Sequence, residues 1–455
     1  MQVCPQNCIH PALDRPEFAL VEHLYIDPAA CINCSACVDA CPAEAIKPAA
    51  ALTDDEQIYA RQSGAYFASL STPRSPRTSK PAIPTAMGPD PLRVAIVGAG
   101  SAAMYTVREL LQRSSSVQVT VFEKSSHPGG LLRTAVSPDH RGIRQMTRLF
   151  DVPFADPRVE TRFNTRVGVD VTIDFLRGRY DAVVLAHGAS RPRDIATAAA
   201  SSAIHQAIDL LADANAAQQN AAAPIGLLSG PTAVIVGGGN VALDVATSIA
   251  RRRILTRSGE PITRVVVVAR SSAHRPSFTF SALHELRQLG VDIAVDSGGT
   301  QISGASADPV GLLLAELARD GCPPTQSARP SVELFFGREV TALTTADGRI
   351  RVDTEKVASG NRVRLTAVAE MSLTADSVIM ATGFACEPLP GVPLGSDGAV
   401  CNNQGRVFSP KSGELIEGLY AVGWAKRGGR GGVGENRRCA AQTVHMIVAD
   451  TAPRV

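Results

Sequence analysis

The chain has 455 residues, of which 45% are hydrophobic and 19% are charged, and its net charge is +2. This composition supports large buried cores in two or three domains and excludes a disordered or fibrous protein. The sequence contains no block of lysine and arginine, which argues against a nucleic-acid-binding protein. It shows no run of 18 apolar residues and no signal peptide, so we expect a cytoplasmic protein without membrane insertion.

Six of the ten cysteines fall within the first 41 residues. Residues 31–42 carry the spacing C-x2-C-x2-C-x3-C-P, in which the first three thiolates hold three irons of one [4Fe-4S] cluster. A fourth, distant thiolate is still needed, and Cys4 is the natural candidate because it is also followed by proline. The candidate metal ligands are therefore Cys4, Cys31, Cys34, Cys37 and Cys41.

Cys41 would ligate a second cluster, but the other ligands of such a cluster are missing from this segment. Either the second cluster is absent or the chain starts too far downstream, and the sequence leaves both open. A zinc knuckle is a weaker alternative, because structural zinc sites use two separated C-x2-C pairs. Free thiols in a small core are a further alternative, and we expect Cys8 to be such a packed thiol.

The first 68 residues form this small iron-sulfur module, and a linker rich in proline, serine and threonine follows over residues 69–91. The next segment, 92–97, has the pattern of a buried parallel strand. It leads into Gly98, Gly100 and Ala102 of a G-x-G-x-x-A motif, and a second strand ends at Glu123. Strand, glycine-rich turn, helix and acidic strand end together form the dinucleotide fingerprint, in which the acid binds ribose hydroxyls.

The same pattern returns 139 residues later, with Gly237 and Gly239 after a strand and Asn240, Val241 and Ala242 opening a helix. Here the second strand ends in Arg270 and Ser271 instead of an acid. An arginine suits the 2′-phosphate of NADP, which an acid would repel. We therefore expect a non-phosphorylated dinucleotide at the first motif and NADP(H) at the second. The alternative is that Arg270 only caps a surface strand.

Two later segments, 377–383 and 418–423, resemble strands that end in glycine, as when a chain returns to a nucleotide-binding sheet. We therefore predict an α/β protein with two Rossmann-like nucleotide-binding domains, preceded by a small α+β ferredoxin-like domain. The first nucleotide-binding domain would comprise residues 92–190 and 375–455, and the second, NADP-binding domain residues 191–374.

Three segments resemble the adrenodoxin-reductase-like ferredoxin–NADP reductases, in particular members with an N-terminal ferredoxin. They are GLLRTAVSPDH at residues 130–140, GNVALDVA at 239–246 and GWAKRG at 423–428. The resemblance extends over nearly the whole chain.

This resemblance implies which residues bind each cofactor. FAD would be held by Ala102, Glu123, Leu131, Val167, Trp424 and the backbone of Gly431, Gly432 and Val433. NADPH would be held by Gly239, Asn240, Val241 and Arg270, with Gly431 near the nicotinamide. The polar residues beside the hydride-transfer site would be His140 and Glu285. Alone, each of these two is an ordinary polar residue.

The chain departs from the family pattern at three places. Ser271 stands where a second arginine is usual, and Ala282 stands where a glutamate contacts the nicotinamide nucleotide. Gly429-Arg430-Gly431 replaces PTG before the flavin contact. These changes bear on cofactor choice and on catalytic efficiency.

The sequence thus predicts an enzyme that moves electrons between NADPH and an iron-sulfur cluster or ferredoxin through FAD. One alternative is a subunit resembling the small subunit of glutamate synthase, because VFEK at 121–124 and GGLLR at 129–133 also resemble that family. A second alternative is a redox or electron-storage protein without turnover.

Overall fold

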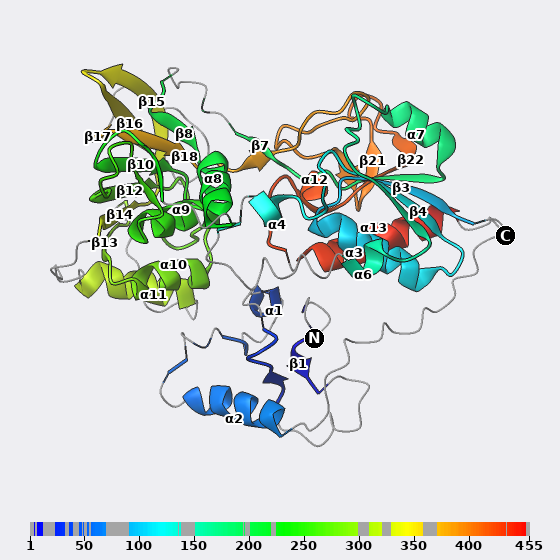
Figure 1. Ribbon diagram of the computed structural model, residues 1–455, viewed down its shortest axis with the longest axis horizontal. Coiled ribbons are helices and arrows are strands. Elements are labelled where there is room, and N and C mark those ends of the chain that lie inside the picture. Colours follow the sequence, from blue (N-terminus) through cyan, green and yellow to red (C-terminus); the bar gives the residue numbers. More distant parts are fainter. Residues whose placement is uncertain are drawn as a thin grey trace. The chain divides into compact units, whose positions relative to one another are not determined.

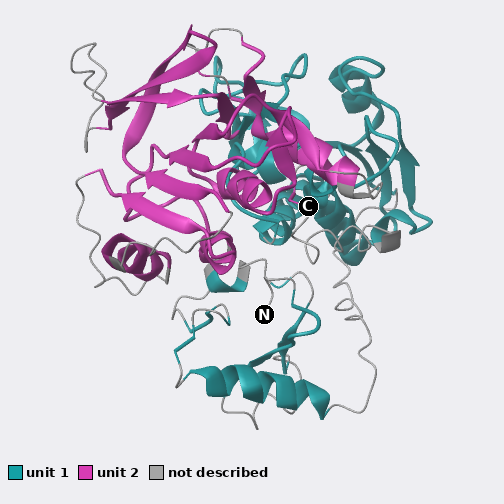
Figure 2. Ribbon diagram, turned by 60° about the vertical axis from the view of Figure 1, so that its left-hand side comes forward, with its two compact units in different colours: residues 1–133, 141–191, 384–455 teal, residues 134–140, 192–383 magenta. Residues whose placement is uncertain are grey.

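The computed structural model describes residues 4, 7–11, 23–31, 36–39, 45–47, 49, 52–53, 56–69, 91–134, 136–137, 151–193, 195, 201–219, 224–298, 309–320, 329–357, 371–433 and 435–451. The chain divides into two compact units (Figure 2). Unit 1 comprises residues 1–133, 141–191 and 384–455, and unit 2 comprises residues 134–140 and 192–383. The second unit is therefore inserted into the first along the sequence.

Unit 1 contains a seven-stranded sheet in the order β20-β21-β22-β6-β3-β4-β5 (Figure 1). Its strands are β3 (Arg93–Val97), β4 (Gln118–Phe122), β5 (Val159–Arg162), β6 (Ala182–Leu185), β20 (Asn402–Asn403), β21 (Arg406–Phe408) and β22 (Leu415–Ala421). The strands from β22 to β5 are parallel, whereas β20 and β21 form an antiparallel edge. Buried runs such as Val94–Val97 are typical of a parallel sheet covered on both faces.

The helices of this part are α3 (Ser101–Arg113), α4 (Leu131–Thr134, whose last residue belongs to unit 2), α6 (Asp151–Phe154), α7 (Ile173–Arg179), α12 (Gly423–Arg427) and α13 (Glu435–Thr451). Helices α3 and α13 lie side by side against the sheet (Figure 1). On α13, Ala440, Val444 and Ile447 are buried, which is the three-to-four-residue spacing of one helix face.

Unit 2 contains a six-stranded parallel sheet in the order β13-β14-β12-β10-β18-β8. Its strands are β8 (Ile204–Gln206), β10 (Thr232–Val236), β12 (Arg264–Val268), β13 (Asp292–Asp296), β14 (Ser331–Phe335) and β18 (Ser377–Met380). Alternate residues of β10 face opposite sides. Ala233 and Ile235 belong to one hydrophobic cluster, and Val234 and Val236 belong to another.

The two faces of this sheet are covered by different structures (Figure 1). Helices α8 (Ala207–Gln219), α9 (Asn240–Ala250), α10 (Phe280–Gln288) and α11 (Pro309–Asp320) supply residues to the cluster on one face. On the other face pack residues of an antiparallel sheet of β15 (Arg338–Ala346), β16 (Arg349–Lys356) and β17 (Met371–Ala375). A short parallel pair, β9 (Ile225–Leu228) and β11 (Ile254–Thr256), completes unit 2.

The structure differs from the sequence analysis in the position of β18. This strand pairs in parallel with β10 and β8, so it belongs to the sheet of unit 2. Residues 375–383, which we expected in the first nucleotide-binding domain, therefore lie in unit 2. The pattern of an apolar strand ending in glycine predicted the strand but did not specify its sheet. Short strands β7 (Arg191–Pro192) and β19 (Phe384–Ala385) lie where the sequence passes between the units.

The described part of the N-terminal segment contains strands β1 (Ile9–His10) and β2 (Tyr25–Ile26), which pair antiparallel, and helices α1 (Ala36–Asp39) and α2 (Gln57–Ala68). The α2 helix packs on β2, where the rings of Tyr25 and Tyr66 stack with their centroids 4.2 Å apart. None of the helices in the described ranges is long and apolar enough to cross a membrane.

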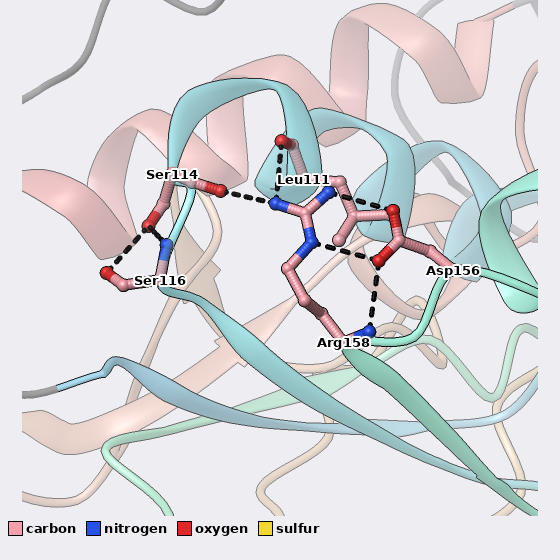
Figure 3. A network of polar contacts seen from close by, with 5 residues as sticks. All are labelled: Leu111, Ser114, Ser116, Asp156 and Arg158. Carbon is pink, nitrogen blue, oxygen red and sulfur yellow. Dashed lines mark hydrogen bonds and ion pairs between the residues drawn. The ribbon is translucent and has the colours of Figure 1, made fainter.

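Arg158 joins the end of α3 to the start of β5 (Figure 3). Its Nε and Nη2 donate to the two oxygens of Asp156, at 2.9 and 2.8 Å. Its Nη1 donates to the carbonyl oxygens of Ser114, at 2.9 Å, and Leu111, at 3.4 Å. Carbonyls at a helix C-terminus have no partner within the helix, so the guanidinium supplies the hydrogen bonds that they lack.

We expect Arg158→Met to lower the free energy of unfolding by ~1–2 kcal/mol, because it removes the guanidinium hydrogen bonds to the helix-end carbonyls and to Asp156, which keeps only the bond from the backbone amide of residue 158. The thermal unfolding midpoint of the full chain measures this change. Arg179→Met is the matched control, since Arg179 is exposed at the end of α7 and its loss should change the midpoint little. Equal effects of the two substitutions would contradict the role given to Arg158.

Candidate nucleotide and iron-sulfur sites

The first glycine-rich turn joins β3 to α3 in unit 1. Gly98 has a φ of +98°, and a β carbon on it would lie 2.7 Å from the carbonyl oxygen of Ala186. Only glycine fits this position without strain. No atom lies within 4 Å of a β carbon built on Gly100, which is also the N-cap of α3. The turn therefore leaves space at a helix N-terminus, the arrangement that binds a pyrophosphate.

Glu123 follows β4 and has only 6% of its surface exposed. Its Oε2 accepts a hydrogen bond from the amide of Ala99 at 2.7 Å, and its Oε1 accepts one from the amide of Ser125 at 2.8 Å. The carboxylate thus fixes the glycine-rich turn to the end of the neighbouring strand. Each oxygen keeps a further lone pair with which to accept a ribose hydroxyl.

Other predicted FAD residues lie around this turn. A β carbon on Gly130, just before Leu131, would lie 3.4 Å from the α carbon of Gly100. The amide of Thr165 donates to the carbonyl of Glu123 at 2.9 Å, which holds the segment leading to the buried Val167 beside that strand end. These contacts bring three separate segments of unit 1 to one edge of its sheet.

The C-terminal segment meets the same helix. A β carbon on Gly423 would lie 2.4 Å from that of Ala102, so Trp424 follows a position in close contact with α3. The indole Nε1 of Trp424 donates to the carbonyl of Gly431 at 2.8 Å, and this bond fixes the loop that carries Gly432 and Val433. A feature absent from our predictions is Glu435, whose carboxylate lies directly against Gly431.

The second glycine-rich turn joins β10 to α9 in unit 2. Gly237 has a φ of +126°, and a β carbon there would lie 2.1 Å from the carbonyl oxygen of Ala381. A β carbon on Gly239, the N-cap of α9, would meet no atom within 4 Å. Asn240 accepts a hydrogen bond from the amide of Thr279 at 2.8 Å, and Val241 follows it on α9. Unit 2 thus repeats the open helix N-terminus of unit 1.

The residues that follow β12 in unit 2 differ from Glu123, which follows β4 in unit 1. Arg270 is exposed there, with Nη1 3.6 Å from Oε1 of Glu339. The hydroxyl of Ser271 is buried and has no hydrogen-bond partner among the described residues. Unit 2 therefore presents positive charge and a hydroxyl donor at the position where unit 1 presents Glu123.

Of the two residues predicted beside the hydride-transfer site, the structure describes only Glu285. Glu285 lies on α10, where its Oε1 accepts a hydrogen bond from Nη2 of Arg251 at 3.1 Å. His140 lies outside the described residues, so its relation to Glu285 stays a prediction. Ala282, one turn before Glu285, is buried with 6% of its surface exposed.

The predicted cluster ligands are only partly described. Cys4 and Cys8 are buried with Ile9 in a small core, and Cys31 and Cys37 pack against it. Cys34 and Cys41 lie outside the described residues. Within the described ranges, no three side chains of histidine, cysteine, aspartate or glutamate are placed to hold a metal ion.

Cys8 lies between two candidate ligands, which the sequence did not indicate. Its Sγ is 3.2 Å from Sγ of Cys4. Hydrogen bonds with Cys31 and Cys4, together with burial, raise the pKa of the Cys8 thiol. A raised pKa favours the neutral thiol and disfavours the thiolate that binds metal.

His187, two residues beyond the end of β6, is another residue that the sequence did not indicate. A β carbon on Gly98 would lie 2.9 Å from its α carbon, so it adjoins the first glycine-rich turn. Both ring nitrogens are buried and lack a hydrogen bond of normal geometry among the described residues. Burial lowers the pKa of His187 to about 4, and Lys124 acts in the same direction while Glu387 opposes it.

The lowered pKa of His187 predicts that the folded protein loses stability in mild acid. The unfolded chain binds a proton at His187 near pH 6.5, whereas the folded chain does so only near pH 4. Stability therefore falls as the pH drops from about 6.5 to about 4, by up to ~3 kcal/mol from this group. His187→Leu should make the thermal unfolding midpoint less dependent on pH in this range. The exposed His127→Leu should keep the original dependence, and an unchanged slope in the His187 variant would contradict the assignment.

Comparisons with known proteins agree with this architecture. Residues 92–316 match the model of the pyridine nucleotide-disulphide oxidoreductase family, and residues 24–47 match that of the 4Fe-4S binding domain. A probable ferredoxin/ferredoxin–NADP reductase of Mycobacterium tuberculosis is 35% identical, over 98% of this chain and 81% of the relative. Its counterpart in Mycobacterium leprae is 34% identical, over 98% of this chain and 83% of the relative.

Among solved structures, FprA of Mycobacterium tuberculosis in complex with NADPH is 27% identical, with a TM-score of 0.66 over 79% of this chain and 84% of that chain. The predicted fold class, two nucleotide-binding α/β domains after a ferredoxin-like segment, is confirmed. These relatives also favour the reductase over the interpretation as a glutamate synthase subunit. The chain belongs to the adrenodoxin-reductase-like ferredoxin–NADP reductases, in the group that carries an N-terminal ferredoxin domain.

Proposed function

We propose that this protein is an FAD-dependent ferredoxin–NADP oxidoreductase, which moves electrons between NADPH and a [4Fe-4S] cluster or a separate ferredoxin. The observation that carries the proposal is the contrast between two otherwise equivalent glycine-rich turns. The strand beside the turn in unit 1 ends in a carboxylate, and the one in unit 2 ends in an arginine. One chain thus offers one site for an unphosphorylated dinucleotide and one for NADP(H).

The residues of unit 1 fit FAD. Gly98 and Gly100 open the space for the pyrophosphate, and Glu123 presents a fixed, buried carboxylate to the ribose. The bond from Trp424 to Gly431 shapes the loop predicted to contact the flavin. When bound, FAD supplies the exchange between two-electron hydride transfer and single-electron transfer. The protein's part is to bind and orient the cofactor.

The residues of unit 2 fit NADP(H). Gly237 and Gly239 expose the N-terminus of α9 to a pyrophosphate, and Arg270 places a guanidinium at the ribose end. The Arg251 side chain holds the carboxylate of Glu285 on α10. We assign Glu285 and His140 the positioning of groups around the hydride-transfer site, with no covalent intermediate.

The N-terminal cysteines fit an iron-sulfur cluster by the chemistry of the donor set. Cys4, Cys31 and Cys37 pack in or against one small core, and the C-x2-C-x2-C spacing also includes Cys34. We assign these four thiolates to one [4Fe-4S] cluster. Cys41 is the candidate ligand of a second cluster, and the protein would donate electrons to a separate ferredoxin or another one-electron acceptor.

The test is cofactor analysis of anaerobically purified protein, followed by turnover. We expect about one FAD and about four irons per chain, and steady NADPH-dependent reduction of a one-electron acceptor such as ferricyanide. NADH should support a lower kcat/KM, because it lacks the phosphate that Arg270 would bind.

The alternatives give different results. Bound flavin without steady turnover would indicate a redox or storage protein and contradict the enzyme assignment. Zinc in place of iron would contradict the cluster. A Cys34→Ser variant, matched with Cys401→Ser in unit 1, should lose iron selectively, since Cys401 lies far from the cysteine-rich segment in the sequence.

A further inference from the structure

A second arginine lies at the carboxyl edge of the unit 2 sheet, 68 residues after Arg270 in the sequence. Arg338 begins β15, directly after β14, which lies between β12 and β13 in the sheet. Ligands of open parallel sheets bind beyond the carboxyl ends of the strands. Arg338 is therefore at the edge that also carries the glycine-rich turn and Arg270.

Two backbone hydrogen bonds fix Arg338 beside the end of β12. The amide of Arg338 donates to the carbonyl of Ala269 at 3.0 Å, and the amide of Gly337 donates to the carbonyl of Ser271 at 2.9 Å. The backbone on both sides of Arg270 is thus hydrogen-bonded to the segment that carries Arg338. The two arginines are neighbours in space although distant in the sequence.

The guanidinium of Arg338 is buried and incompletely paired. Only 11% of its side chain is exposed, and Nη2 lies 3.7 Å from Oδ2 of Asp296. Among the described residues, neither Nε nor Nη1 has a hydrogen-bond partner. Buried donors of a charged group are costly to leave unpaired, so this site favours an additional acceptor.

The hydroxyl of Ser271, on the strand end whose backbone is bonded to the Arg338 segment, adjoins the phosphate-binding turn. A β carbon on Gly238 would lie 3.7 Å from the Ser271 hydroxyl and 2.4 Å from the β carbon of Ala269. The hydroxyl is therefore next to the turn, and it too lacks a partner among the described residues. Arg270, Ser271 and Arg338 together offer two guanidinium groups and one hydroxyl, which suit a dianionic phosphate.

We propose that Arg338, with Arg270 and the hydroxyl of Ser271, binds the 2′-phosphate of NADP(H) and sets the preference of unit 2 for NADP(H) over NAD(H). This inference rests on the proposed function, because it assigns a specificity residue to the nicotinamide-nucleotide site. Arg338 supplies the second positive charge that is missing at position 271.

Each of the two arginines has a carboxylate nearby. The distances between arginine and carboxylate are compatible with phosphate binding. Glu339 lies 3.6 Å from Arg270, and Asp296 lies 3.7 Å from Arg338. Both distances exceed those of charge-assisted hydrogen bonds, which are 2.7–2.9 Å. The carboxylates hold the guanidinium groups in place, and Nε and Nη1 of Arg338 keep no partner among the described residues. Glu339→Gln should strengthen NADP⁺ binding, because it removes the negative charge nearest to the exposed Arg270.

The experiment is equilibrium binding of NADP⁺ and of NAD⁺ to the full-length, cofactor-loaded protein by calorimetry. Arg338→Met keeps an unbranched stem and removes the charge. We expect the Kd for NADP⁺ to rise about 10- to 100-fold and the Kd for NAD⁺ to change less than about twofold. Arg351→Met is the matched control, since Arg351 pairs with Asp353 in the three-stranded sheet, and it should leave both constants unchanged.

A second variant keeps the test decisive if Arg338→Met does not fold. Ser271→Ala should raise the Kd for NADP⁺ about three- to tenfold and leave that for NAD⁺ unchanged. Equal weakening of both nucleotides by Arg338→Met would assign Arg338 a structural role, and no weakening would place it outside the site. Either result overturns this inference. A wild-type protein that binds neither nucleotide, or prefers NAD⁺, would instead contradict the proposed function.

Discussion

The nucleotide sites depend on a steric constraint where a parallel strand ends against its neighbour. At Gly98 and Gly237 the backbone of an adjacent segment occupies the space of a β carbon, at 2.7 and 2.1 Å from carbonyl oxygens. The chain can turn sharply there only with glycine, and the turn aims a helix N-terminus at open space. In unit 1 the turn is further fixed by the hydrogen bond from the amide of Ala99 to Glu123.

Two units with the same turn differ in the residue at the end of the next strand, and we propose that this residue sets the specificity of each. In unit 1 that residue is a buried carboxylate whose oxygens are fixed by two amides, so we expect it to accept ribose hydroxyls and to repel a phosphate. In unit 2 it is an exposed guanidinium, with Arg338 held beside it by backbone hydrogen bonds. In our proposal, charge at one strand end, rather than a change of fold, gives the two sites different nucleotide preferences.

The sequence predicted those features that depend on neighbouring residues. The turns, the strands before them and the residues ending the next strands are contiguous patterns, and the structure contains each turn between the expected strand and helix. It did not indicate Arg338 or His187, because their roles arise from strands that become neighbours only in the folded sheet. The sheet of β18 was predicted wrongly for the same reason, since an apolar strand pattern carries no information about its partners.

The assignment of one turn to FAD and the other to NADP(H) is the central claim, and matched glycine variants test it most directly. Gly98→Ala and Gly237→Ala each add one methyl group at a position of positive φ. The account predicts that purified Gly98→Ala contains much less FAD, whereas Gly237→Ala keeps about one FAD per chain and binds NADP⁺ weakly. Loss of FAD from Gly237→Ala, with FAD retained in Gly98→Ala, would contradict the assignment.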